Sequence, residues 1–241
     1  MSNIGEAFTW AFKTPSWFGT FLVMGLIGLI PIIGQINLLG WALAGTDNLR
    51  AGYQVLPPAG FQYIARGFNV AVVALVYGLV IFFPLAFLLF GGIIGSAALD
   101  ANGNTGGFAT GIFSTSAFSL FALVGLAFAA FYPVVIVRTE HGGIAGGLNV
   151  VEVVRTFLAK PGAALITAVV MYVGSYLGGL GLLACCVGLL VTYPWYYTVI
   201  GGAIASYERD LGLAPPAGSY PMGGPGPQPP TYGSPPPVAP A

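Results

Sequence analysis

Side chains that could do chemistry together occur in two short stretches of the second half of the chain: Arg138, Glu140, His141, Glu152 and Arg155. If these stretches meet, the group could bind a metal ion or the phosphate of a lipid headgroup. One His beside scattered carboxylates does not match the ligand sets of zinc sites. We therefore expect interfacial anchoring and local ion pairs here. The candidate headgroup contacts are Arg138, His141, Arg155 and Lys160.

Two further polar side chains, Gln35 and Asn37, interrupt the first apolar run of the sequence. Polar groups inside a bilayer need hydrogen-bond partners, so this pair could line a cavity for a neutral solute or a lipid. The sequence contains no Gly-rich phosphate loop, nucleophile elbow or zinc-ligand spacing. We therefore predict no catalytic residue, no metal site and no cofactor, and we do not expect an enzyme.

The C-terminal residues 211–241 contain 11 prolines, 6 glycines and no charged residue. A segment of this composition cannot form a packed core, so we predict a disordered tail with polyproline II character. The stretch from Pro229 to Tyr232 suits aromatic-lined grooves of WW type. A protein partner would therefore contact Pro229, Pro230 and Tyr232, and a flexible spacer is the alternative.

The composition indicates a membrane protein. Only 6% of the residues are charged and 56% are apolar, whereas a soluble domain carries roughly 25% charged residues. The net charge is zero, which argues against nucleic acid as a partner. All 7 Lys and Arg residues fall in segments that one topology places on the same side of a bilayer. Because basic residues mark the cytoplasmic side, we predict that both termini are cytoplasmic.

The first apolar run, residues 17–46, is too short for two full crossings, which need about 40 residues. We expect a helical hairpin of short or tilted arms that turns near Pro31–Asn37, and such a hairpin could be re-entrant. A single span is the alternative. Residues 47–66 are polar and rich in turn residues, which is typical of a cytoplasmic linker.

The later runs are long enough to span the membrane. Residues 67–99 and 112–137 each predict one span, and the loop 100–111 between them has no Lys or Arg, which assigns it to the outside. Residues 162–207 predict two spans with a turn between Gly178 and Gly188. The expected fold is an all-α integral membrane protein with about six membrane helices over residues 1–210, followed by the tail.

Two amphipathic interfacial helices are expected before the first and last hairpins, at residues 2–13 and 149–160. Asn3 and Glu6 have the spacing of a capping box, and so do Asn149 and Glu152. Together with Pro15 and Pro161, these pairs repeat at a constant offset of 146 residues. Such an internal repeat is common in transporters, although three identities can also arise by chance.

Several motifs resemble an uncharacterised prokaryotic membrane-protein family, catalogued as domain of unknown function four thousand and thirteen. The motifs lie at residues 3–8, 12–17, 29–34, 40–43, 50 and 56–57, and near the end at 185–189 and 192–195. The resemblance covers roughly residues 3–207. It implies a multi-pass protein of the prokaryotic inner membrane, and it brings no activity and no catalytic residues.

Two functions are consistent with these features. The first is a non-enzymatic scaffold or interaction protein whose cytoplasmic tail recruits a partner. The alternative is a transporter-like or lipid-handling protein with a site between the repeated hairpins, near Gln35 and Asn37.

Overall fold

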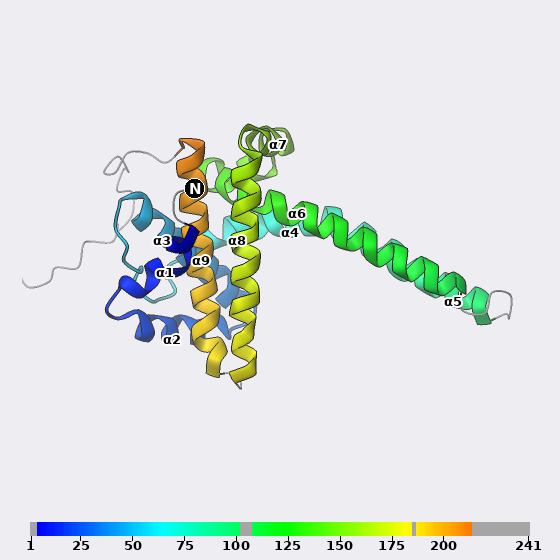
Figure 1. The fold of residues 1–241 in the computed structure, drawn as a ribbon, viewed down its shortest axis with the longest axis horizontal. Coiled ribbons are helices and arrows are strands. Elements are labelled where there is room, and N and C mark those ends of the chain that lie inside the picture. Colours follow the sequence, from blue (N-terminus) through cyan, green and yellow to red (C-terminus); the bar gives the residue numbers. More distant parts are fainter. Residues whose placement is uncertain (1–3, 102–107, 185–186, 214–241) are drawn as a thin grey trace, which may run out of the picture.

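The computed structural model describes residues 4–101, 108–184 and 187–213, and every regular element within these ranges is helical. The predicted all-α fold is confirmed for this part of the chain. Figure 1 shows a helical body from which one long hairpin extends to the side.

The first described element is a short helix that packs on the last helix. Helix α1 (Ile4–Thr9) continues into the 3-10 turn η1 (Trp10–Lys13) and docks on α9 (Val187–Leu211). The indole of Trp10 is buried and donates from Nε1 to the Thr198 carbonyl at 3.0 Å. In the opposite direction, Trp195 Nε1 donates to the Phe8 carbonyl at 3.1 Å. The apolar face of the predicted surface helix is thus partly buried against α9.

The first apolar run forms two helices, α2 (Trp17–Gly28) and α3 (Ile33–Arg50). Between them, Ile33 N–H donates to the Pro31 carbonyl at 2.7 Å and Ile32 has a φ of 66°. This is the geometry of a γ-turn, which is strained for a β-branched residue. The turn lies at residues 29–32, earlier than predicted, so Gln35 and Asn37 lie inside α3 rather than in the turn.

The long hairpin contains the next three helices. Helix α4 (Ile64–Tyr77) passes through the π-helical turn η2 (Gly78–Phe82) into α5 (Phe83–Ala101), and α6 (Phe108–Leu148) returns beside α5. A kink at Gly143, with a φ of 63°, ends the straight part of α6. We call the projecting part, residues 83–101 and 108–128, the arm. Its exposed side chains include many large apolar ones, among them Phe83, Phe87, Phe90, Ile94, Leu123 and Leu126.

The last part of the chain is a short helix followed by an antiparallel pair. Helix α7 (Val150–Ala159) lies across the end of α8 (Pro161–Gly179), and the 3-10 turn η3 (Leu180–Ala184) leads toward α9 (Figure 1). Asn149 Oδ1 accepts the Glu152 backbone N–H at 3.2 Å, and Pro161 is the first residue of α8. The predicted cap and end of this helix are therefore confirmed. Helix α9 packs against α1, α2, α3 and α8 and forms the centre of the body.

Glycines allow backbone to approach backbone where these helices cross. A Cβ on Gly67 of α4 would lie 1.8 Å from the Ile36 carbonyl oxygen of α3, and one on Gly25 of α2 would lie 2.1 Å from the Leu190 oxygen of α9. Gly174 and Gly178 of α8 face Tyr196 and other residues of α9, as their spacing predicts. The similarly spaced Gly91 and Gly95 of the arm would have no atom of the described residues within 4 Å of an added Cβ, so their spacing marks no contact within the described structure.

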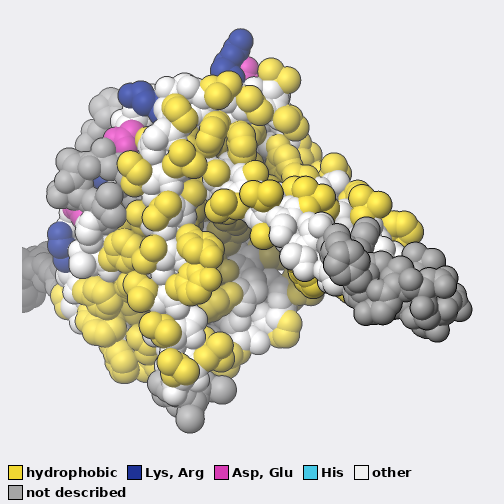
Figure 2. All heavy atoms as spheres, turned by 45° about the vertical axis from the view of Figure 1, so that its right-hand side comes forward, with side chains coloured by type: hydrophobic (Ala, Val, Ile, Leu, Met, Phe, Trp, Pro, Cys, Tyr) yellow, Lys and Arg dark blue, Asp and Glu magenta, His cyan; other side chains and the backbone are white. Residues whose placement is uncertain are grey.

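Three helical stretches of the described chain are long and apolar enough to cross a membrane: Ile64–Ala98, Ser114–Leu148 and Pro161–Leu183. Helix α2, with 12 residues, is about 18 Å long and therefore shorter than the roughly 30 Å hydrocarbon core. Figure 2 shows hydrophobic side chains spread over one face of the body, with the few charged ones near its edges. By length and composition, three described stretches could therefore cross a membrane, and the count of about six membrane helices remains a prediction.

Candidate functional site: an ion-pair network between four helices

Arg50, the last residue of α3, lies at the centre of a partly buried ion-pair network. Its Nε donates to Glu208 Oε2 at 2.6 Å, and its Nη2 donates to Oε1 of the same carboxylate. Its Nη1 donates to Asp47 Oδ1 at 2.6 Å. The Arg50 side chain is 4% exposed and that of Glu208 is 0% exposed. The two-pronged contact is the strong geometry that an arginine makes with a carboxylate.

Arg66 extends the network from α4. Its guanidinium donates to both Asp47 and Glu140, and Glu140 Oε2 also lies 4.0 Å from Arg50 Nη1. His141 Nε2 lies 3.1 Å from Glu208 Oε1. Four helices, α3, α4, α6 and α9, therefore meet through charged side chains. We call this group the ion-pair network, with the members Asp47, Arg50, Arg66, Glu140, His141 and Glu208.

The charges of the network nearly balance. Two arginines face three carboxylates, which gives a net charge of −1 when His141 is neutral and zero when it is protonated. Charges taken out of water are tolerated when they are paired and hydrogen-bonded. The arrangement thus joins helices that are far apart in the sequence and leaves their charges paired.

The surroundings of Glu208 favour its ionised form. Burial alone opposes ionisation and raises the pKa of this carboxyl, but the hydrogen bonds and charges of His141 and Arg50 outweigh burial. The pKa of Glu208 is therefore lower than its usual value. A carboxyl whose pKa is lower in the folded state stabilises the fold above its unfolded pKa and loses that contribution as the pH falls through its folded pKa.

We expect a specific acid sensitivity from this group. The contribution of Glu208 should be complete at neutral pH and should fall only below about pH 4, the usual range of a glutamate. Thermal unfolding of the full chain in mild detergent, measured from neutral to acidic pH, tests this. Glu208→Gln should flatten the acid part of the curve, whereas Glu152→Gln, at a carboxylate that is 31% exposed, should leave it unchanged. An unaltered curve for Glu208→Gln would contradict the assignment.

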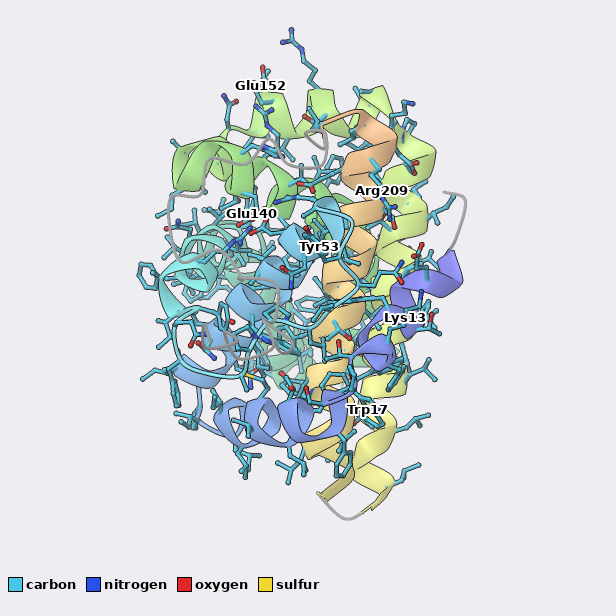
Figure 3. All side chains as sticks on the ribbon, turned by 90° about the vertical axis from the view of Figure 1, so that its left-hand side faces the viewer. Lys13, Trp17, Tyr53, Glu140, Glu152 and Arg209 are labelled. Atoms are coloured by element: carbon cyan, nitrogen blue, oxygen red, sulfur yellow. The ribbon has the colours of Figure 1, made fainter. Side chains whose placement is uncertain are left out.

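The structure divides the five clustered side chains of the sequence into two groups. Glu140 and His141 belong to the ion-pair network, whereas Arg138, Glu152 and Arg155 form a separate group beside α7. Arg138 Nη2 lies 3.2 Å from Glu152 Oε2, and Arg155 Nη1 lies 3.2 Å from Glu152 Oε1. Figure 3 places Glu152 farther toward the end of the molecule than Glu140, with Trp17 toward the opposite end.

Gln35 and Asn37 lie among packed helices of the body. Gln35 Oε1 accepts hydrogen bonds from the hydroxyls of Tyr193 and Tyr197 on α9, and its Nε2 donates to the Gly28 carbonyl at 2.9 Å. Asn37 Nδ2 donates to the Gly60 carbonyl at 2.8 Å. Its Oδ1 is buried and has no hydrogen-bond partner among the described residues. Gln35 thus joins α3 of the first hairpin to α9 of the last.

Removing the Gln35 amide should weaken this contact between hairpins. Gln35→Leu leaves the hydroxyls of Tyr193 and Tyr197 without their shared acceptor, and each unsatisfied buried group costs about 1–3 kcal/mol. We expect a lower unfolding midpoint of the full chain in detergent. Gln62→Leu is the matched control because Gln62 is exposed and donates to its neighbour Tyr63. Equal midpoints for both variants would show that the contact does not stabilise the fold.

The sequence prediction missed the network members Asp47, Arg50, Arg66 and Glu208 as a group. Residues 47–66 were predicted to form a cytoplasmic linker, and that prediction assigned no partner to their charged side chains. The useful signal is the scarcity of charge: with 6% charged residues, a charged side chain next to apolar runs needs a partner within the protein. That argument indicates that pairs exist, but it does not say which residues pair.

Two further sites were considered from the sequence: the partner-binding tail, which was predicted, and a metal site, which was not. The tail residues Pro229, Pro230 and Tyr232 lie outside the described residues. Within the described part, no group of three or more His, Cys, Asp or Glu side chains is arranged to hold a metal ion.

The helical body, its apolar spans and its internal ion pairs define a helical membrane-type protein. A family model described as "Protein of unknown function (DUF4013)" matches residues 23–192, more than half of the chain. The chain belongs to this family, which confirms the resemblance seen in its motifs. Searches of curated proteins and of solved structures return no match.

Proposed function

We propose that this protein is a non-enzymatic membrane scaffold that holds a partner-binding tail at the cytoplasmic face of the bilayer. The observation that carries the proposal is how the charged and polar side chains of the body are used. The network from Asp47 to Glu208 and the Gln35 contact with two tyrosines join helices to one another. Side chains used in this way build a rigid support.

The position of the tail is consistent with holding a bound partner close to the membrane body. Helix α9 is the centre of the body and ends at Leu211, so the Pro-rich residues 211–241 follow directly from the most extensively packed helix. Proline-rich segments bind aromatic-lined grooves at low entropic cost because they are already extended. The proposed partner is a cytoplasmic protein with such a groove, and it would contact Pro229, Pro230 and Tyr232.

Capture of partners by crosslinking in membranes tests this function. The full chain is compared with a chain ending at Leu211 and with the variant Pro229→Ala, Pro230→Ala, Tyr232→Ala. The matched control is Pro235→Ala, Pro236→Ala, Tyr220→Ala, which makes the same changes elsewhere in the tail. We expect the same protein to be captured by the full chain and the control but not by the other two. Capture that is unaffected by truncation would overturn the scaffold function.

A transporter-like or lipid-handling function is the second candidate. It is favoured by the buried Asn37 Oδ1 without a partner among the described residues, and by the polar contact of Gln35 with Tyr193 and Tyr197 between the two hairpins. Such a site would retain a small polar molecule or a lipid headgroup. Mass spectrometry of small molecules that copurify with the full chain tests it: a species lost in Asn37→Leu and Gln35→Leu but kept in Gln62→Leu would support this function over the first.

A further inference from the structure

We propose that α7 and the adjoining Arg138 form a binding surface for anionic phospholipid in the cytoplasmic leaflet. The surface, here called the α7 patch, consists of Arg138, Glu152, Arg155, Lys160 and the exposed apolar residues of α7. The proposal concerns the membrane body and does not depend on the partner-binding function of the tail.

The position of α7 places it at a membrane boundary. Its last residue, Ala159, is followed by Lys160 and then by Pro161, where the candidate span Pro161–Leu183 begins. Figure 1 shows α7 lying across the end of α8 rather than continuing along it. A helix that lies across the start of a span is held at the level of the lipid headgroups.

The packing of α7 fixes which face it presents to the surroundings. Val153 is 3% exposed, and the Phe157 ring stacks on Phe131 of α6 with centroids 4.3 Å apart. The opposite side leaves Val151 73% exposed and Leu158 66% exposed. These apolar side chains gain from burial among acyl chains, because no part of the described protein covers them.

The charges of the α7 patch match an anionic surface. Arg138, Arg155 and Lys160 are opposed by the single carboxylate of Glu152, which leaves a net charge of +2. Arg155 is 77% exposed, and Lys160 is exposed as well. By contrast, the ion-pair network has a net charge near zero, so its arginines are already neutralised. Cationic side chains beside an exposed apolar face are typical of helices that bind anionic membranes.

Arg138, whose side chain is 29% exposed, keeps one N–H group without a hydrogen-bond partner among the described residues. Its Nη2 pairs with Glu152, but its Nε is buried and has no hydrogen-bond partner among the described residues. A guanidinium can donate two parallel hydrogen bonds to a phosphate, which a lysine cannot do. His141 is excluded from the patch because it contacts Glu208 in the network.

Native mass spectrometry of the full chain tests the proposal. Protein purified in detergent is mixed with equal amounts of phosphatidylglycerol and phosphatidylcholine, and the bound lipids are counted. Because a basic residue near an anionic surface contributes about 1 kcal/mol, Arg155→Gln with Lys160→Gln should bind phosphatidylglycerol about 30-fold more weakly. The matched control is Lys13→Gln with Arg209→Gln, which removes two exposed cations elsewhere and should bind like the unaltered chain.

Two variants with single substitutions distinguish a loss of lipid binding from damage to the fold. Glu152→Gln removes the carboxylate that competes for Arg138 and Arg155, so it should strengthen phosphatidylglycerol binding, which a damaged fold would not do. Arg138→Lys keeps the charge but removes Nε, and it should weaken binding while the unfolding midpoint is retained. Equal losses in the two double variants, or no preference of the unaltered chain for phosphatidylglycerol, would overturn the proposal. Competition by inorganic phosphate at equal concentration would overturn the assignment to a lipid.

Discussion

Arg50→Met should destabilise the protein more than any other single change in its body. The substitution leaves the fully buried Glu208 carboxylate facing His141 without its arginine, and breaking a buried pair on one side costs about 3–5 kcal/mol. For a chain of this size, that loss lowers the unfolding midpoint by about 6–20 °C. Thermal unfolding of the purified chain in mild detergent, followed by circular dichroism, measures it.

Two companion variants show whether the loss comes from the unpaired charge. Arg155→Met removes an arginine whose side chain is 77% exposed, and exposed pairs contribute only about 0–1 kcal/mol. The double variant Arg50→Met, Glu208→Met removes both charges and should recover part of the stability lost in Arg50→Met. If adding Glu208→Met to Arg50→Met lowers the stability further instead of restoring part of it, the two side chains do not act as a pair.

Gly67→Ala should separate α3 from α4. The added Cβ would lie 1.8 Å from the Ile36 oxygen and 2.8 Å from the Gly40 nitrogen, and both are backbone atoms that cannot rotate away. Overpacking of this kind costs about 1–3 kcal/mol and more where the neighbours are rigid. We expect a lower unfolding midpoint in detergent, and a further decrease for Gly67→Val.

The arm provides the matched control for this prediction. Gly91→Ala makes the same chemical change on α5, where no atom of the described residues lies within 4 Å of the added Cβ. Alanine also favours helix formation over glycine by about 1 kcal/mol in aqueous hosts, so this variant should be as stable as the original or more so. If both variants lose the same stability, the close crossing of α3 and α4 is not the cause.

Local signals in the sequence predicted the ends of helices well. The Asn149 cap and Pro161 predicted α7 within a residue at each end, because a cap and a proline act on their own neighbours. The span predicted at residues 112–137 ends too early, because α6 continues through Pro133 to Leu148. Residues 133–137 are buried, and α6 packs against α4 and α8. Packing between distant helices cannot be seen in a local window of the sequence.

Pairings between distant residues could not be predicted from spacing. Gln35 was placed near a turn because Pro31 and Gly34 break helices, but its tyrosine partners lie 158 and 162 positions later. The Arg50 and Glu208 pair is likewise separated by 158 positions. Helix periodicity indicates which face is apolar, and it does not indicate which helices meet.

The 158-position separation of Arg50 and Glu208 also determines when their contact can form during synthesis of the chain. Arg50 leaves the ribosome long before Glu208, and at about 5–20 residues per second the 158 intervening positions take roughly 8–30 seconds. Throughout this interval the Glu208 carboxylate is missing, while Asp47 is already present and Glu140 arrives on the way. The contact between Arg50 of α3 and Glu208 of α9 can therefore form only after nearly all of the body has been synthesised.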